Sequence, residues 1–136
     1  MKKDRHAPEV PAEWQEEARE RWGGTEAYRQ SAERTARYGK KEWAEIRNEL
    51  SAIDAGFAAL MGRAPDDSEV QALCERNRAA FHRWFYDCTP EFLRNVSDLW
   101  VHDPRFRENI DRTAPGLAEF KHRAVQVFAD RARIPR

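Results

Sequence analysis

Residues 41–62 read KEWAEIRNELSAIDAGFAALMG, the most regular stretch of the sequence. Its large apolar residues recur at alternating steps of three and four, the period of an amphipathic helix that buries one face. We therefore expect a long helix from about Lys41 to Gly62, followed by a loop rich in Pro and Asp. The buried face of this helix comprises Trp43, Ile46, Leu50, Ile53, Phe57 and Leu60.

Cap and breaker residues place further helices after this one. A capping side chain at position 67 or 68 starts a helix whose apolar stripe continues to Cys88. Thr89-Pro90 and Asp103-Pro104 each put a capping residue before a proline, which is tolerated at the first helical position. A last helix opens near Ala114-Pro115. Since no convincing strand is found, the expected fold class is all-α.

The first forty residues differ from the rest in composition. Residues 1–11 are charged and carry two prolines, so we expect a disordered tail. A short helix then stops at Gly23-Gly24, and Thr25 caps a second helix that ends near Tyr38. Segment 12–38 lacks aliphatic core residues, so its helices are marginal alone. They either dock on the core or become ordered when a ligand supplies apolar surface. Their large aromatic residues are Trp14, Trp22, Tyr28 and Tyr38.

Composition bounds the class of protein. The 136 residues suffice for one domain, and 24 basic residues balance 24 acidic ones. Nucleic-acid modules usually carry a basic excess, so this chain is not expected to bind nucleic acid by itself. No apolar run approaches the ~20 residues that span a membrane, and no secretory signal is visible. Two free thiols fit a reducing compartment, and a cytoplasmic location is the default.

The stretch Phe81-His82-Arg83-Trp84-Phe85-Tyr86-Asp87-Cys88 places three aromatic residues before a thiol. As the end of a helix, it would put Phe81, one of the following aromatics and Cys88 on one face, lining an apolar cavity with a nucleophile at its rim. The amino end of the next helix would favour the Cys88 thiolate, with Asp87 opposing it. The alternative is a small buried cysteine that only packs.

Other polar residues carry weaker indications. Cys74 is expected to pack in the core, about 21 Å along the same helix from Cys88, too far for a disulfide. Asn77 lies on an otherwise apolar face, where its amide either caps a neighbouring helix or contacts a ligand. His82 and Cys88 would lie on different helix faces, so no catalytic dyad is expected. The four histidines show no metal-ligand spacing, and we expect no catalytic residues, metal or other cofactor.

Three blocks of sequence resemble the TipAS antibiotic-recognition domain family, in matching order from about residue 13 to residue 129. They are Trp22-Gly23-Gly24-Thr25-Glu26-Ala27-Tyr28, then Arg83-Trp84-Phe85-Tyr86-Asp87-Cys88, then Asp103-Pro104-Arg105-Phe106 with Asp111 and Pro115-Gly116-Leu117-Ala118. The family forms the effector-binding half of MerR-type transcription regulators of the TipA group, and it also occurs as a free domain.

The resemblance implies a globin-like bundle of about five to seven helices, with a deep ligand cleft. The implied domain covers residues 12–136, with lid helices in 12–38 that close over the drug and a helical core in 40–133. In thiopeptide binders of the family a cysteine adds to a dehydroalanine of the antibiotic, and Cys88 matches that position. We expect the cleft to be lined by Phe57, Asn77, Phe81, Trp84, Phe85, Tyr86, Phe92 and Trp100.

The leading hypothesis is a module that binds and sequesters a hydrophobic multi-ring peptide antibiotic, with a thiopeptide as the first candidate. One alternative is a standalone, noncovalent resistance protein for another multi-ring drug such as albicidin. A sensor or interaction module with a purely structural core is a second alternative, and a thiol enzyme or a haem protein is poorly supported. The chain lacks a helix-turn-helix, so DNA binding would require fusion to one, and a monomer is expected.

Overall fold

The computed structural model describes residues 25–133 and is all-α over that range, which confirms the predicted fold class. The tail 1–11, the helix expected before Gly23-Gly24 and the lid residues Trp14 and Trp22 lie outside the described residues. The helices within the range are α2 (Glu26–Thr35), α3 (Lys40–Ala59), α4 (Ser68–Trp84), α5 (Pro90–His102), α6 (Pro104–Asp111) and α7 (Leu117–Arg133).

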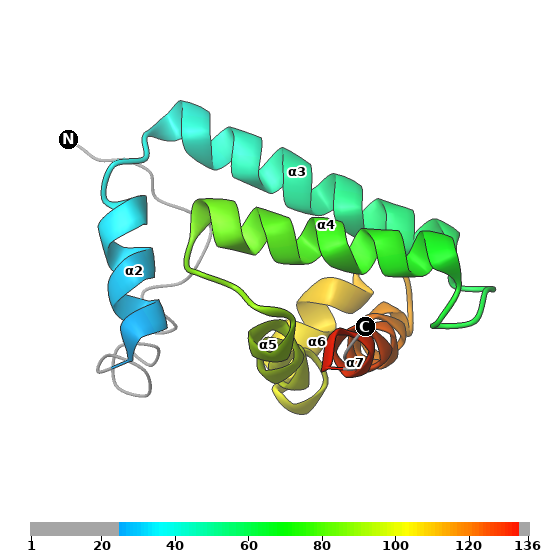
Figure 1. Ribbon diagram of the computed structural model, residues 1–136. Coiled ribbons are helices and arrows are strands. Elements are labelled where there is room, and N and C mark those ends of the chain that lie inside the picture. The colour runs from blue at the N-terminus through cyan, green and yellow to red at the C-terminus, as the bar shows by residue number, and fades with distance from the viewer. Residues whose placement is uncertain (1–24, 134–136) are drawn as a thin grey trace.

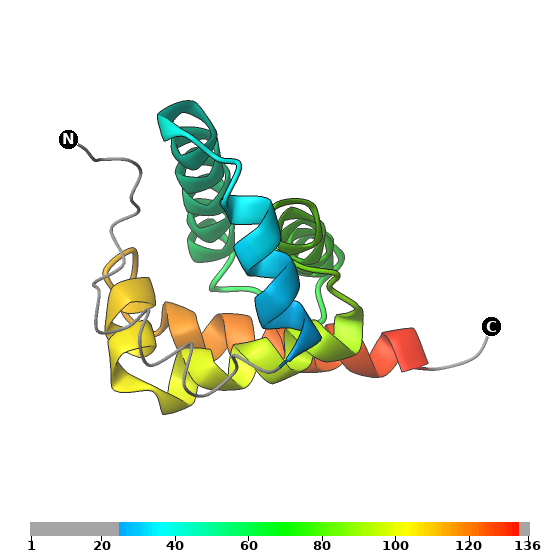
Figure 2. The same cartoon turned by 90° about the vertical axis from the view of Figure 1, so that its left-hand side faces the viewer.

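The helices form two layers that cross each other (Figure 1). Antiparallel α3 and α4 lie side by side in one layer, while α5, α6 and α7 make up the other, and both α5 and α7 run across the first layer (Figure 2). Helix α7 packs against α5 and against α4, so it joins the two layers. Helix α2 stands at the edge where α4 ends and α5 begins, and contacts α4.

Each predicted capping side chain starts its helix. The hydroxyl of Thr25 accepts a hydrogen bond from the Tyr28 backbone N–H at 3.2 Å, and that of Thr89 accepts one from Phe92 N–H at 3.0 Å. The carboxylates of Asp67 and Asp103 do the same for α4 and α6, at 2.8 and 3.0 Å. These contacts satisfy amide groups that have no partner inside the helix, which fixes where each helix begins.

Helix ends were predicted less well. Helix α2 ends at Thr35, not near Tyr38, and α4 ends at Trp84, so the helix expected to reach Cys88 is four residues too long. Helix α7 begins only at Leu117, because Gly116 has φ +85°, a left-handed conformation that L-residues rarely adopt. Just beyond Gly116, the backbone N–H of Ala118 donates to the Asp111 carboxylate at 2.9 Å.

The core lies between the two layers and is apolar with few exceptions. Phe57 of α3 is fully buried and meets Phe120 of α7 edge-to-face, with ring centroids 6.5 Å apart. Gly56 lets α4 approach α3, since a Cβ there would lie 3.1 Å from the side chain of Leu73. None of the helices within residues 25–133 is long and apolar enough to span a bilayer. Other core residues include Ile46, Ile53, Val70, Leu93, Leu117 and Val125.

Candidate functional site

The turn between α4 and α5 is where the structure departs most from the prediction. The backbone N–H groups of Phe85 and Tyr86 both donate to the Phe81 carbonyl, at 2.9 and 3.1 Å, which closes α4 and bends the chain away. Thr89 must be extended to cap α5 and to precede a proline, so a helix cannot run into it. Cys88 therefore lies in this turn and not on the face of α4.

Seven aromatic side chains form a continuous cluster around this turn. Neighbouring rings have centroids 5.1 to 6.4 Å apart, mostly tilted or edge-to-face, which is the preferred geometry for aromatic pairs. Elements far apart in the chain supply the rings: the α2–α3 link, α3, α4, the turn and α5. We call this set the aromatic cluster: Tyr38, Trp43, Phe81, Trp84, Phe85, Tyr86 and Phe92.

One member of the aromatic cluster is fixed, and the others remain accessible. Trp84 is buried; its indole N–H donates to the Glu49 carboxylate at 2.7 Å and its carbonyl accepts from the Tyr38 hydroxyl at 2.8 Å. The remaining six are each partly exposed. Partly exposed, pre-positioned rings suit binding of a flat, apolar ligand by stacking.

The structure brings together five of the predicted cleft residues and adds two to them. Phe81, Trp84, Phe85, Tyr86 and Phe92 all belong to the aromatic cluster. Tyr38, expected in the lid, joins them, as does Trp43, which the helical pattern had marked only as a buried position of its helix. The other lid tyrosine, Tyr28, is partly exposed on α2.

Cys88 is buried, contrary to the expectation of a thiol at the rim of a cavity. Only 1% of the surface of Cys88 is exposed to solvent. Its N–H donates to Nδ1 of His82 at 3.1 Å, and its carbonyl accepts from the Arg78 guanidinium at 2.7 Å. The prediction placed His82 and Cys88 on different faces of one helix, but α4 ends at Trp84 and the turn folds back over its end. The contact with the His82 ring is made by the Cys88 backbone N–H and not by the thiol.

The surroundings of Cys88 also set its acidity. Burial raises the pKa of the Cys88 thiol to about 12, and the nearby Arg78 charge only partly opposes this. A pKa near 12 leaves roughly one thiol in 10⁵ ionised at pH 7. Burial therefore outweighs the expected help from the amino end of α5. Cys74 is similar: it is a free, buried thiol whose pKa burial raises to about 12, as expected for a packing residue.

Two of the remaining predicted cleft residues, Phe57 and Trp100, lie around a buried charge that was not predicted from the sequence. Lys121 of α7 is 4% exposed, and its ammonium donates to Asp54 of α3 at 2.6 Å. The same nitrogen lies 4.2 Å from the ring centroid of Trp100 and 5.4 Å from that of Phe57. Lys121 lies between Leu117 and Ala124 on the apolar stripe of its helix. A charged residue at that position is the sequence signal that could have indicated a buried charge.

Asn77 occupies the polar position in the α4 stripe that the sequence singled out. It is 2% exposed, and its side-chain oxygen meets no hydrogen-bond donor in the described part of the chain. A buried amide oxygen without a donor is costly, which distinguishes this position from ordinary packing. The predicted helix-capping role is not seen for that oxygen.

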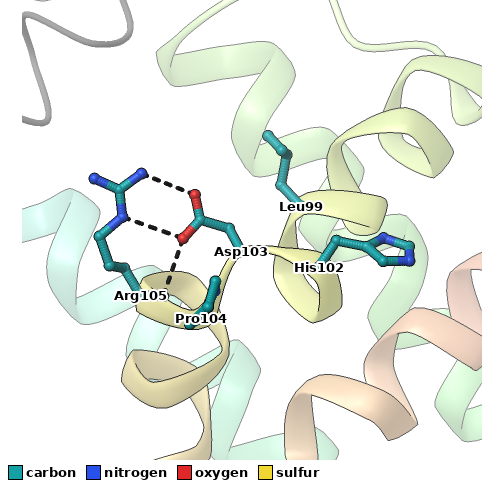
Figure 3. Close-up of a pocket in the computed structure, with 5 residues that line it drawn as sticks. All are labelled: Leu99, His102, Asp103, Pro104 and Arg105. Atoms are coloured by element: carbon teal, nitrogen blue, oxygen red, sulfur yellow. Dashed lines mark hydrogen bonds and ion pairs between the residues drawn. The ribbon is translucent and has the colours of Figure 1, made fainter.

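A shallow hollow lies at the corner between α5 and α6 (Figure 3). It has a volume of about 460 Å³ and is lined by Leu99, His102, Asp103, Pro104 and Arg105. The Asp103 carboxylate holds the Arg105 guanidinium with two hydrogen bonds, of 3.1 and 2.9 Å (Figure 3).

One face of α5 connects this hollow to the aromatic cluster. Phe92, Val96 and Leu99 follow one another at steps of four and three, so they share a face, and all three are partly exposed. From Phe92 to Leu99 the axial rise is about 10 Å. The α5 face, with the aromatic cluster at one end and the hollow at the other, is an elongated and largely apolar surface.

In residues 25–133 no three His, Cys, Asp or Glu side chains gather in a way that could hold a metal ion.

Comparison with known proteins gives consistent results. Residues 14–128 match the TipAS antibiotic-recognition domain family. The HTH-type transcriptional activator TipA of Streptomyces coelicolor is 40% identical over 123 residues, which cover 89% of this chain and 49% of TipA. The HTH-type transcriptional activator mta of Bacillus subtilis is 32% identical over 113 residues, 83% of this chain and 44% of mta. The chain thus spans about half the length of these relatives.

Two solved structures share the fold. One is TipAS in complex with nosiheptide, from a thiopeptide antibiotic multidrug resistance system of Streptomyces lividans. It is 38% identical, has a TM-score of 0.87 and is matched over 92% of this chain and 89% of its own. The other is the antibiotic-binding domain of a TipA-class multidrug resistance transcriptional regulator, with a TM-score of 0.63, 32% identity and coverage of 68% and 100%.

Proposed function

The chain belongs to the TipAS antibiotic-recognition domain family, and we propose that it is the antibiotic-binding module of a drug-responsive, MerR-type transcription regulator, or a free form of that module. In the regulator, DNA contacts would come from a helix-turn-helix outside this domain. The aromatic cluster is the observation that carries the proposal, since a soluble domain rarely leaves so many connected rings partly exposed without a ligand to cover them.

The ligand class follows from the shape and chemistry of the site. Six partly exposed rings and the apolar α5 face offer an extended surface with few hydrogen-bonding groups. Flat heteroaromatic rings stack on such side chains, and each contact contributes about 0.5–1.5 kcal/mol beyond its apolar burial. Multi-ring peptide antibiotics present several azole rings at once. A thiopeptide is therefore the ligand we propose, in line with the nosiheptide complex of the related TipAS.

Covalent capture by Cys88 is a separate step of the proposal. In such a step the thiolate sulfur bonds to the terminal carbon of a dehydroalanine, and the electron pair of the alkene takes up a proton at the α-carbon. Because the thiol is buried and burial raises its pKa to about 12, we expect it to add to the alkene only after the turn around it has opened. We therefore propose that recognition is noncovalent and that any adduct forms slowly afterwards.

Calorimetric titration with nosiheptide tests the proposal. Trp43→Ala should raise the dissociation constant at least about fivefold, because one stacking ring is lost. Phe128→Ala is the matched control, since Phe128 is also a partly buried aromatic but lies on α7 outside the aromatic cluster. Equal affinities for the two variants, at unchanged melting temperature, would remove the aromatic cluster from the binding site.

Intact-mass measurement addresses the covalent step. We expect Cys88→Ala to bind nosiheptide as tightly as the wild type in the first minutes, and an adduct on the wild type to accumulate only over hours. Loss of all binding in Cys88→Ala, in a folded protein, would show that capture and recognition are the same event.

A standalone resistance protein for a different multi-ring drug is the second candidate, and the buried thiol favours it. Such a protein would need no reactive cysteine. Titration with albicidin beside nosiheptide distinguishes the two. Binding of albicidin alone would replace the thiopeptide proposal, and binding of nosiheptide alone would remove this alternative.

A further inference from the structure

Helix α2 is held in place by polar contacts that converge on the turn between α4 and α5. Asp87 in that turn accepts from the Arg34 guanidinium at 2.8 Å and from the Gln30 amide at 3.2 Å. The backbone N–H of Asp87 donates back to the Gln30 amide oxygen at 2.7 Å. Arg34 also donates to the His82 carbonyl at 2.7 Å, near the end of α4, where carbonyls lack helical partners.

Within residues 25–133, apolar burial contributes little to holding α2, so its docking depends largely on these polar contacts. No residue of α2 is buried. The ion pair between Arg34 and Asp87 is partly exposed, at 31% and 62% for the two side chains, and pairs of that kind contribute only modestly. Helix α2 can therefore leave without opening the core.

Cys88 lies in the same turn, directly next to these contacts. The Cys88 N–H and carbonyl are tied to His82 and Arg78 of α4, while the residue directly before it, Asp87, is tied to α2. Phe85 and Tyr86 of the aromatic cluster lie in this turn as well. The contacts of α2 thus end on the residue directly before the thiol, in the same turn as two of the stacking rings.

We propose that Asp87 is a positioning residue that couples α2 to the turn, so that docked α2 keeps Cys88 enclosed and release of α2 makes the thiol accessible. This inference deepens the proposed function, on which it rests only for the identity of the ligand. Helix α2 then has a second role beside that of a lid, because it controls when the sulfur can react.

Thiol alkylation without any drug tests this coupling directly. The wild type and variants are treated with iodoacetamide, and labelling of Cys88 and Cys74 is followed peptide by peptide by mass spectrometry. We expect Arg34→Met and Asp87→Asn to raise the labelling rate of Cys88 about three- to tenfold, as expected when a charge-assisted contact that limits local opening is lost. Arg34→Lys, which keeps the charge, should restore part of the protection.

Two controls make the result specific. Arg29→Met removes an α2 arginine whose ion pairs are with Glu26 and Glu33 of the same helix, so Cys88 labelling should stay within about twofold of the wild type. Cys74, which lies on α4 away from the turn, should label at the same slow rate in every variant. An unchanged Cys88 rate in Arg34→Met, or an equal rise at Cys74, would overturn the coupling.

The outcome is independent of the proposed function. If nosiheptide does not bind but Arg34→Met exposes Cys88, the coupling stands and the ligand is wrong. If nosiheptide binds and Arg34→Met leaves Cys88 as slow as in the wild type, the ligand stands and the coupling is wrong.

Discussion

Substituting either partner of the ion pair between Lys121 and Asp54 tests how much this buried pair contributes to the stability of the fold. The two conservative changes are Lys121→Met, which keeps the length of the side chain, and Asp54→Asn, which keeps its shape. Lys121→Met leaves the Asp54 carboxylate unpaired, whereas Asp54→Asn leaves the Lys121 ammonium unpaired. The lysine side chain is 6% exposed and the aspartate side chain 24%, so an unpaired ammonium is cut off from water far more than an unpaired carboxylate.

The difference in exposure sets the expected magnitudes. Removing one partner of a buried ion pair costs about 3–5 kcal/mol when the remaining charge stays dry. For Asp54→Asn we expect about 3 kcal/mol, because the rings of Trp100 and Phe57 compensate the ammonium only in part. For Lys121→Met we expect about 1 kcal/mol, because water can reach Asp54 and a methionine packs against both rings. The double variant should resemble Lys121→Met, which corresponds to a coupling of about 3 kcal/mol between the two positions.

Urea unfolding followed by circular dichroism measures the free energy of unfolding of all four proteins. The slope of that free energy against urea concentration should be the same in each, so that the values can be compared. The predicted order of stability is wild type, then Lys121→Met and the double variant together, then Asp54→Asn. If Lys121→Met proves the more damaging single change, or if the two effects simply add, the burial argument for Lys121 fails.

Two further changes are accessible to the same assay. Burial raises the pKa of Cys88 from about 9 to about 12, so the folded state keeps a proton that the unfolded state gives up above pH 9. Stability should therefore fall as the pH rises from about 9 towards 12, by up to about 4 kcal/mol. Cys88→Ala should flatten this decline relative to the wild type, and identical slopes would show that the thiol is not protected. Gly116→Ala should cost about 1 kcal/mol, because φ is +85° there, and a neutral substitution would mean that α7 starts differently in solution.

Local features of the fold were predictable from the sequence. Thr25, Asp67, Thr89 and Asp103 each act on amides within three residues, so the sequence around them is enough to place a helix start. The structure also explains part of the sequence pattern that resembles the TipAS family. Asp103 caps α6 and Asp111 binds an amide at the start of α7, so part of the C-terminal block maintains helix boundaries.

Features that depend on contacts between distant residues were not predictable. Asp54 and Lys121 are 67 positions apart, and neither shows its partner in the sequence. The position of Cys88 was missed because the apolar period continues past Trp84, while the chain must already be extended to cap α5. Its burial depends on folding the turn back over α4, which helical periodicity does not encode. The members of the aromatic cluster in α4, the turn and α5 were predicted as cleft residues, but Trp43 of α3 joins the cluster through its ring contacts with Tyr38 and Phe85.

Nuclear magnetic resonance of the labelled protein during titration with nosiheptide tests the central claim most directly. The indole N–H of Trp43 and the amides from Phe85 to Leu99 should shift most, because they belong to the aromatic cluster and to the α5 face. The exposed end of α7, around Arg131, should not move. Saturable shifts confined to α7, or no shifts with the drug in excess over the protein, would contradict the assignment of this surface as the antibiotic site.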